Sequence, residues 1–293
     1  MSKRSHSLVR MISRDYADGD LTTMLGLEQE LWREDPALVA CTFGQVAFWS
    51  AQLLHDDWQA RLWFEGDELV GWGWLTKGVE LEWEVRPTHQ VLLDEILDWA
   101  RPTEVLVGSH HADAIERLRA HRLEHDPAAP WMRSNIRSLD QLEEPQLPVG
   151  YHLTTMAAYD DFASRSAAHR TAFSPSRFFD DIYAKVRETW PYRADLDCVA
   201  VAPDGSVASY TLAWLDEVNA LGELEPVGTH EDHRQLGLGR AVNLFALQRL
   251  RDEGATTALV GCRGDAAYPI PCKLYESVGF RERARSIAFR HKS

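Results

Sequence analysis

The second half of the chain carries the clearer pattern of apolar and polar positions. Leu244, Leu247 and Leu250 recur at helical spacing, so we expect an amphipathic helix that ends before Gly254. Two apolar runs flank Pro203-Asp204-Gly205, a sequence typical of a tight turn, and predict a β-hairpin. The expected elements in order are a strand (151–154), two helices (156–171 and 176–188), three strands (197–202, 207–215 and 221–229), a helix (238–252), a strand (258–261), a helix (272–277) and a strand (286–290).

The first half repeats this plan more faintly. A hairpin is expected around the turn Glu65-Gly66-Asp67, and strand and helix patterns alternate after it. The expected elements are strands (62–64, 69–75 and 81–85), a helix (91–100), a strand (105–107) and a helix (114–122). Residues 137–150 combine charges, prolines and a glycine, a composition typical of a linker. We therefore predict two domains, residues 1–145 and 150–293, related by an internal repeat.

Composition narrows the functional class. With 293 residues the chain is long enough for two domains that each bury a core. No apolar run reaches the roughly 18 residues of a membrane span, and the basic N-terminus lacks the apolar segment of a secretory signal. We expect a soluble, cytoplasmic protein without a membrane partner. The net charge of −14 argues against nucleic-acid binding, because that would need a basic surface.

The four cysteines predict neither a disulfide framework nor a metal site. Cys41, Cys198, Cys262 and Cys272 are scattered without C-x-x-C spacing, so we expect reduced core thiols. The histidines show no H-E-x-x-H or comparable spacing. We therefore predict no bound metal.

A basic, glycine-punctuated turn joins the strand 221–229 to the helix 238–252. N–H groups at a helix start have no partner within the helix, and the helix dipole adds positive charge there, so such a junction binds phosphate. Gly237 and Gly239 would let a phosphate approach the main chain without meeting a Cβ. Val242 stands where a dinucleotide fingerprint needs its third glycine, and no P-loop sequence is present. A plain tight loop remains the alternative interpretation.

A second segment favours the phosphate-binding interpretation of that turn over the plain loop. The order Arg234-x-x-Gly237-x-Gly239, then Leu274-Tyr275-x-x-x-Gly279-Phe280, resembles the two signatures of the GNAT superfamily of N-acyltransferases. The resemblance implies an α/β (α+β) fold of two tandem GNAT-like domains, each with a mixed central sheet flanked by helices.

The N-terminal copy is expected to be degenerate. Its counterpart of the glycine turn is 86–90, which contains no glycine, and Arg119 occupies the place of the tyrosine. We expect this half to have a structural role or to form one wall of the substrate cleft. An unrelated α/β fold remains the alternative for it.

The resemblance also implies acetyl-CoA as co-substrate. Its pantetheine arm would pair with the backbone of Val227, Gly228 and Thr229, where a main-chain N–H would polarise the thioester carbonyl. Its pyrophosphate would be held by the side chains or N–H groups of Arg234, Gln235, Leu236, Gly237, Leu238, Gly239, Arg240 and Ala241.

Candidate acid and base groups lie beside this turn. Period-two alternation places Glu223 and Glu225 on one face of the strand, where mutual repulsion raises at least one pKa toward the range of a general base. The segment 222–228 is similar to G-E-x-x-x-V-G of the tandem-domain mycothiol synthases, which places the family's base at Glu223 and leaves Glu225 open. By the same resemblance, Tyr275 would protonate the departing thiolate. Tyr268 stands where the superfamily often has asparagine, a departure at the entry to the last helix.

These features together predict an N-acetyltransferase that acts on a small-molecule primary amine by direct attack in a ternary complex. The acidic chain favours a cationic acceptor, bound between the two halves. The alternative is a non-catalytic acyl-CoA-binding sensor or scaffold. The identity of the amine, the acyl-chain preference and the oligomeric state have no signal in the sequence.

Overall fold

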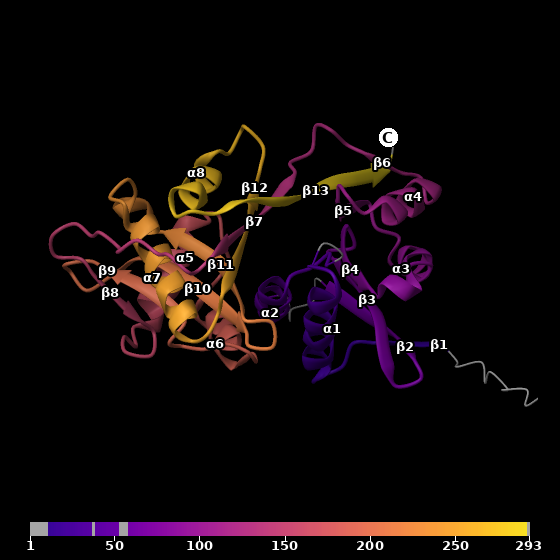
Figure 1. Ribbon diagram of the computed structural model, residues 1–293, viewed down its shortest axis with the longest axis horizontal. Helices are drawn as coiled ribbons and strands as arrows, with labels where there is room; N and C mark the ends of the chain where they lie inside the picture. Colours follow the sequence, from indigo (N-terminus) through magenta and orange to yellow (C-terminus); the bar gives the residue numbers. More distant parts are fainter. Residues whose placement is uncertain (1–10, 37–38, 53–57, 292–293) are drawn as a thin grey trace, which may run out of the picture.

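The computed structural model describes residues 11–36, 39–52 and 58–291 (Figure 1). Within these residues, thirteen strands form one continuous mixed sheet in the order β1-β2-β3-β4-β5-β13-β7-β12-β11-β10-β9-β8, and β6 pairs with β13. The helices flank this sheet, so the predicted fold class is confirmed. In the described part of the chain, none of the helices has both the length and the apolar character needed to cross a membrane.

The first half begins with elements that precede the predicted hairpin. Its elements are β1 (Met11–Asp15), α1 (Asp20–Glu34), α2 (Phe43–Gln52), β2 (Trp58–Glu65), β3 (Glu68–Thr76), β4 (Glu80–Val85), the 3-10 helix η2 (Pro87–His89), α3 (Leu92–Ala100), β5 (Glu104–Gly108), α4 (Ala112–Ala120), β6 (Leu123–His125) and β7 (Met132–Ser138). The predicted hairpin, strands and helices from residue 62 onward are confirmed within a few residues. β1, α1, α2, β6 and β7 were not predicted.

The second half repeats this order, apart from a counterpart of β6. Its elements are β8 (His152–Thr155), α5 (Phe162–Ala172), α6 (Asp180–Glu188), β9 (Asp197–Val201), β10 (Val207–Asp216), β11 (Leu221–Thr229), the 3-10 helix η3 (Glu231–His233), α7 (Leu238–Asp252), β12 (Thr257–Arg263), α8 (Ile270–Ser277) and β13 (Arg281–His291). The predicted internal repeat is therefore seen element by element, from β1 and β8 onward.

The predicted starts of α5 and α6 were wrong, since these helices begin at Phe162 and Asp180. The side chain of Asp161 accepts a hydrogen bond from the Ser164 N–H at 2.9 Å, which makes Asp161 the N-cap of α5. In α6, Asp180 and Asp181 lie in the first turn, where carboxylates stabilise the positive end of the helix.

The two halves exchange their last strands. β7 of the first half pairs antiparallel with β12, and β13 of the second half pairs antiparallel with β5. β7 and β13 also pair with each other, as Figure 1 shows where the yellow β13 runs from one half into the other. The predicted linker at 137–150 thus began too early, since residues 137 and 138 belong to β7. The boundary near Gly150 lies between β7 and β8 and stays a prediction.

An apolar cluster joins the halves through α2. Phe43, Val46 and Phe48 of this helix belong to the same buried cluster as Tyr183 of α6 and Trp214 of β10. In Figure 1, α2 lies next to the orange strands of the second half. Burial of such side chains contributes about 1.5–3 kcal/mol each, so we expect the relative placement of the halves to be stable.

A buried ion pair fixes the helices of the second half to its sheet. Arg165 of α5 donates from Nε to Asp197 Oδ1 of β9 at 2.9 Å, and both side chains are almost fully buried. Tyr183 donates its hydroxyl to the other carboxylate oxygen at 2.6 Å. The Arg165 guanidinium also lies 3.5 Å from the ring centroid of Tyr210. These partners compensate for the cost of burying both charges.

Candidate active site

Strands β11 and β12 separate part-way along their length. Their parallel pairing runs from Leu221↔Thr257 to Glu223↔Leu259 and includes no later residue of β11. Pro226 has no N–H to donate, which explains why regular pairing does not continue on this side. On its other side β11 stays paired with β10 as far as Thr229. The prediction from Pro226 and Gly228 that this strand bulges or splays is therefore confirmed, and in the described part of the chain the edge of β11 from Val227 to Thr229 that faces β12 has no strand partner.

The glycine turn forms the N-terminus of α7. Gly237 is the N-cap in the left-handed region at φ 79°, a conformation that glycine adopts at little cost. No atom would meet a Cβ built on Gly237 within 4 Å, so the space in front of this position is open. The N–H groups of Leu238 and Gly239 have no acceptor within the helix. The turn thus has the donors and the clearance that a pyrophosphate requires.

Two arginines flank the turn and are held loosely. Arg234 is exposed and donates to the carbonyl of Ala172 at 3.3 Å, and Arg240 forms a 2.7 Å ion pair with Glu143 at the surface. Exposed ion pairs of this kind contribute at most about 1 kcal/mol. Both guanidinium groups are therefore available to bind an anion.

A pocket opens where the strands separate, between the two halves. We call it the central pocket. Its cavity volume is about 200 Å³. Its lining includes Thr42, Gln45 and Glu82 of the first half, Glu223, Glu225 and Val260 of the second half, and Arg133, Arg283 and Arg285 of the exchanged strands. Both predicted carboxylates thus face the same space.

Glu223 is held by the N-terminus of α2. Its carboxylate accepts hydrogen bonds from the Thr42 hydroxyl and, at 2.7 Å, from the Gly44 N–H. A Cβ on Gly44 would lie 2.8 Å from the carboxylate oxygen, so glycine is needed for this approach. Burial raises the pKa of Glu223, hydrogen bonds from Thr42, Gly44 and the Gln45 N–H lower it, and the result is a pKa of about 6.

Glu225 lies two residues further along the same face. Burial is the main cause that raises its pKa to about 8, and the charge of Glu223 adds to the shift. The expected repulsion between the two carboxylates is therefore present, as the smaller of the two causes. At neutral pH the pair carries about one negative charge, mostly on Glu223.

Tyr275 of α8 is buried, 7% exposed, in the core cluster of the second half. Burial raises its pKa well above the usual value, and the charge of Glu225 is the next cause. The hydroxyl therefore keeps its proton at neutral pH and lies within electrostatic reach of Glu225. α8 also contacts the glycine turn, because a Cβ on Gly239 would lie 3.5 Å from the Leu274 side chain.

A family model described as "Acetyltransferase (GNAT) family" matches residues 140–280. This range contains the glycine turn, both carboxylates of β11 and Tyr275. Residues 140–280 form a GNAT acetyltransferase domain.

Similar sequences are mycothiol acetyltransferases. The protein of Nocardiopsis dassonvillei is 28% identical over 167 residues, 53% of this chain and 49% of the relative, so the match spans about half of that relative's length. The protein of Streptomyces coelicolor is 26% identical over 246 residues, 77% of each chain.

Solved structures have the same tandem architecture. A tandem GNAT protein from the clavulanic acid biosynthesis pathway aligns over 96% of this chain and 98% of its own, with a TM-score of 0.65 and 15% identity. A GCN5-related N-acetyltransferase from Sphaerobacter thermophilus aligns over 96% of this chain and 95% of its own, with a TM-score of 0.63 and 18% identity. Together with the repeat of elements, these likenesses show a tandem GNAT layout.

The GNAT domain receives groups from the first half that the sequence did not indicate. Thr42 and Gly44 contact Glu223, and Glu82 lines the central pocket with a pKa raised by burial. The Cys41 thiol donates to Glu82 at 2.9 Å. The sequence contains one weak indication that the first half contributes to the site. The segment Glu80-Leu-Glu-Trp-Glu84 repeats the acidic strand of the second half.

Proposed function

We propose that this protein transfers an acetyl group from acetyl-CoA to a small primary amine bound in the central pocket. The observation that carries the proposal is the meeting of two β11 carboxylates, Glu223 and Glu225, with groups of the first half where β11 and β12 separate. Tyr275 lies within electrostatic reach of Glu225, and the glycine turn contacts Leu274 of the helix that carries Tyr275.

Acetyl-CoA would supply the acetyl group as a thioester. The N–H groups at the start of α7, with Arg234 and Arg240, would bind its pyrophosphate. The free edge of β11 from Val227 to Thr229 would pair with its extended arm. A main-chain N–H on that edge would polarise the thioester carbonyl.

The side chains divide the proton transfers between them. Glu223, with a pKa of about 6, is ionised at neutral pH and is the group we propose to accept the ammonium proton. Glu225, with a pKa of about 8, is mostly protonated and limits the charge of the pair. Tyr275 keeps its proton because burial raises its pKa, and it would give that proton to the departing thiolate. The amine then attacks directly within a ternary complex.

The charge of the pocket supports a cationic acceptor. Glu82, Glu223 and Glu225 line it without an arginine or lysine ion pair in the described part of the chain. Of the arginines that line the pocket, Arg133 forms a 2.7 Å ion pair with Glu276, and Arg285 pairs with Glu282. At neutral pH the ionised Glu223 therefore presents a negative charge to the amine, whereas Arg283 also lines the pocket as a positive group.

Thiol release from acetyl-CoA tests the proposal over a panel of primary amines of equal size and different charge. We expect turnover with cationic amines and a fall in kcat/KM at high salt, because salt screens the attraction. Binding of acetyl-CoA without turnover on any amine would instead support a sensor. A preference for anionic amines would contradict the cationic acceptor.

A further inference from the structure

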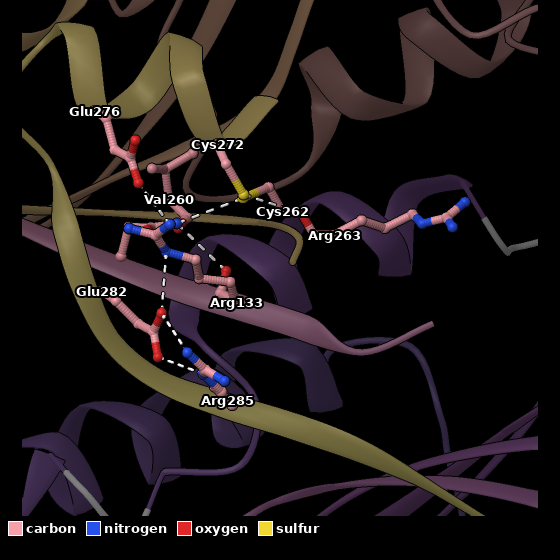
Figure 2. Close-up of polar contacts among 9 residues, drawn as sticks. Arg133, Val260, Cys262, Arg263, Cys272, Glu276, Glu282 and Arg285 are labelled. Carbon is pink, nitrogen blue, oxygen red and sulfur yellow. Dashed lines mark hydrogen bonds and ion pairs between the residues drawn. The ribbon is translucent and has the colours of Figure 1, made fainter. Parts of the chain in front are cut away.

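Two cysteines meet beside α8. Cys262 lies near the end of β12 and Cys272 in the first turn of α8, and their Sγ atoms are 3.5 Å apart (Figure 2). The residues between them, 264–269, form the connection from the strand to the helix. Since the two thiols are in van der Waals contact, a disulfide of about 2.05 Å needs only a small approach of the sulfur atoms.

The two thiols have different surroundings. Cys262 is buried, 6% exposed, and the Asn135 side-chain amide lies 3.5 Å from its sulfur. Burial is the main cause that raises the pKa of this thiol to about 12, so it is a poor first nucleophile. Cys272 is partly exposed and its thiol donates to the Arg263 carbonyl at 3.2 Å.

A cation stands next to the pair. Figure 2 shows Arg133 of β7 between the cysteines and two carboxylates, Glu276 of α8 and Glu282 of β13. Glu276 pairs with Arg133 at 2.7 Å, and Glu282 approaches it to 3.6 Å. Because a guanidinium close to a thiol favours the thiolate, Arg133 lowers the pKa of Cys262, as a minor cause beside burial.

We propose that Cys262 and Cys272 form an oxidation site for a hydroperoxide, which converts the pair into a disulfide. The Cys272 thiolate attacks one oxygen of hydrogen peroxide, the O–O bond breaks, and hydroxide leaves and takes up the proton released by the thiol. The Cys262 thiol then attacks the resulting sulfenic acid, an S–S bond forms, and water leaves. In sum, two thiols lose two electrons and two protons, and one peroxide becomes two waters.

This bond would act on the helix that carries Tyr275. Cys272 precedes Tyr275 by less than one helical turn, and Leu274 of the same helix contacts the region of Gly239. Drawing Cys272 toward β12 displaces the start of α8 and with it the hydroxyl of Tyr275. Misplacement of a reacting group by about 1 Å can cost about 100-fold in rate. This consequence rests on the role proposed for Tyr275, whereas the oxidation itself does not.

The first experiment measures the chemistry alone. The full-length protein is treated with hydrogen peroxide and digested without reductant. We expect one peptide pair that links Cys262 to Cys272, lighter by two hydrogen atoms than the separate peptides, and lost on reduction with a dithiol. The Cys198→Ala variant, which changes a buried cysteine of β9, should form the same link. Sulfinic acid at Cys272 without a linked peptide, or no reaction at either cysteine, would refute the proposal.

The second experiment measures acetyl transfer by the oxidised protein. We expect the disulfide form to lose about 10- to 100-fold in turnover and to recover it with the dithiol. The Cys272→Ser and Cys272→Ala variants should keep their activity in peroxide. Unchanged turnover in a fully cross-linked sample would contradict the coupling to α8. A reduced protein without any turnover would contradict the proposed function, and the peptide link would still decide the oxidation site.

Discussion

Replacing Thr42 by valine should move the acid limb of the pH profile of kcat/KM upward. The Thr42 hydroxyl donates to Glu223, so it stabilises the ionised carboxylate and lowers its pKa, which stands at about 6. Valine has nearly the same shape but no hydroxyl. A hydrogen bond to a charged group contributes about 1.5–3 kcal/mol, and one pKa unit corresponds to about 1.4 kcal/mol.

The loss of this donor can therefore raise the pKa of Glu223 by at most about one to two units. The Gly44 N–H remains as a second donor to Glu223, so we expect a shift of about one unit, from about 6 to about 7. The sign follows from the role of a base: activity is present above the pKa of Glu223 and is lost as the pH falls through it. A higher pKa makes that loss begin at a higher pH.

The assay records kcat/KM against pH for one amine at saturating acetyl-CoA. Because wild type and variant use the same amine, its own titration cancels from the comparison. Thr256→Val is the matched control, since Thr256 is exposed and its hydroxyl contacts only the Ala220 carbonyl at 3.4 Å in the described structure. An unchanged acid limb in Thr42→Val would refute the reasoning. An acid limb near pH 8 in the wild type would transfer the role of base to Glu225, whose pKa is about 8.

Four further outcomes test other parts of the structure. Gly239→Val should weaken acetyl-CoA binding in calorimetry with little change in folding, because its Cβ would have only ordinary contacts at 3.4 and 3.5 Å; unchanged affinity would contradict the phosphate site. Tyr275→Phe should lower kcat by about 10²–10⁴-fold, the range of a lost proton donor, with acetyl-CoA affinity retained; full activity would exclude that role. Asp197→Asn should lower the free energy of unfolding by about 3–5 kcal/mol in urea, since it breaks a buried ion pair, whereas Asp195→Asn at a half-exposed pair should cost about 1 kcal/mol or less. A fragment of residues 150–293 should fail to unfold cooperatively, because it lacks β7, the partner of both β12 and β13; a cooperative transition would show that the second half folds alone.

Local pattern determined much of the second half. The strand 221–229 and the helix 238–252 have in the structure the bounds that their apolar spacing and the following Gly254 indicate. The glycine turn between them was also readable, because a helix start with glycines has a fixed local geometry. The two motifs of the domain lie within such segments, so the family was accessible from the sequence.

Other elements carry no local signal of their own. β7 reads MRSNIRS, with few apolar residues, and it is a strand because β12 and β13 supply hydrogen-bonding partners on both sides. In α1, Glu28 is buried on the apolar face beside Trp72, its hydrogen-bond donor at 3.0 Å, which interrupts the hydrophobic period. Such positions depend on contacts that are distant in the chain.

Some features of the candidate site follow from the sequence alone, and others only from the tertiary structure. The sequence by itself determined which carboxylates share a face of β11, because the alternation of a strand is a local property. Only the tertiary structure decided their protonation. The pKa values of Glu223 and Glu225 depend on burial between the halves and on the donors of Thr42 and Gly44, which lie 181 and 179 residues from Glu223 in the chain. Desolvation and hydrogen bonding act through space, so no local pattern could have specified them.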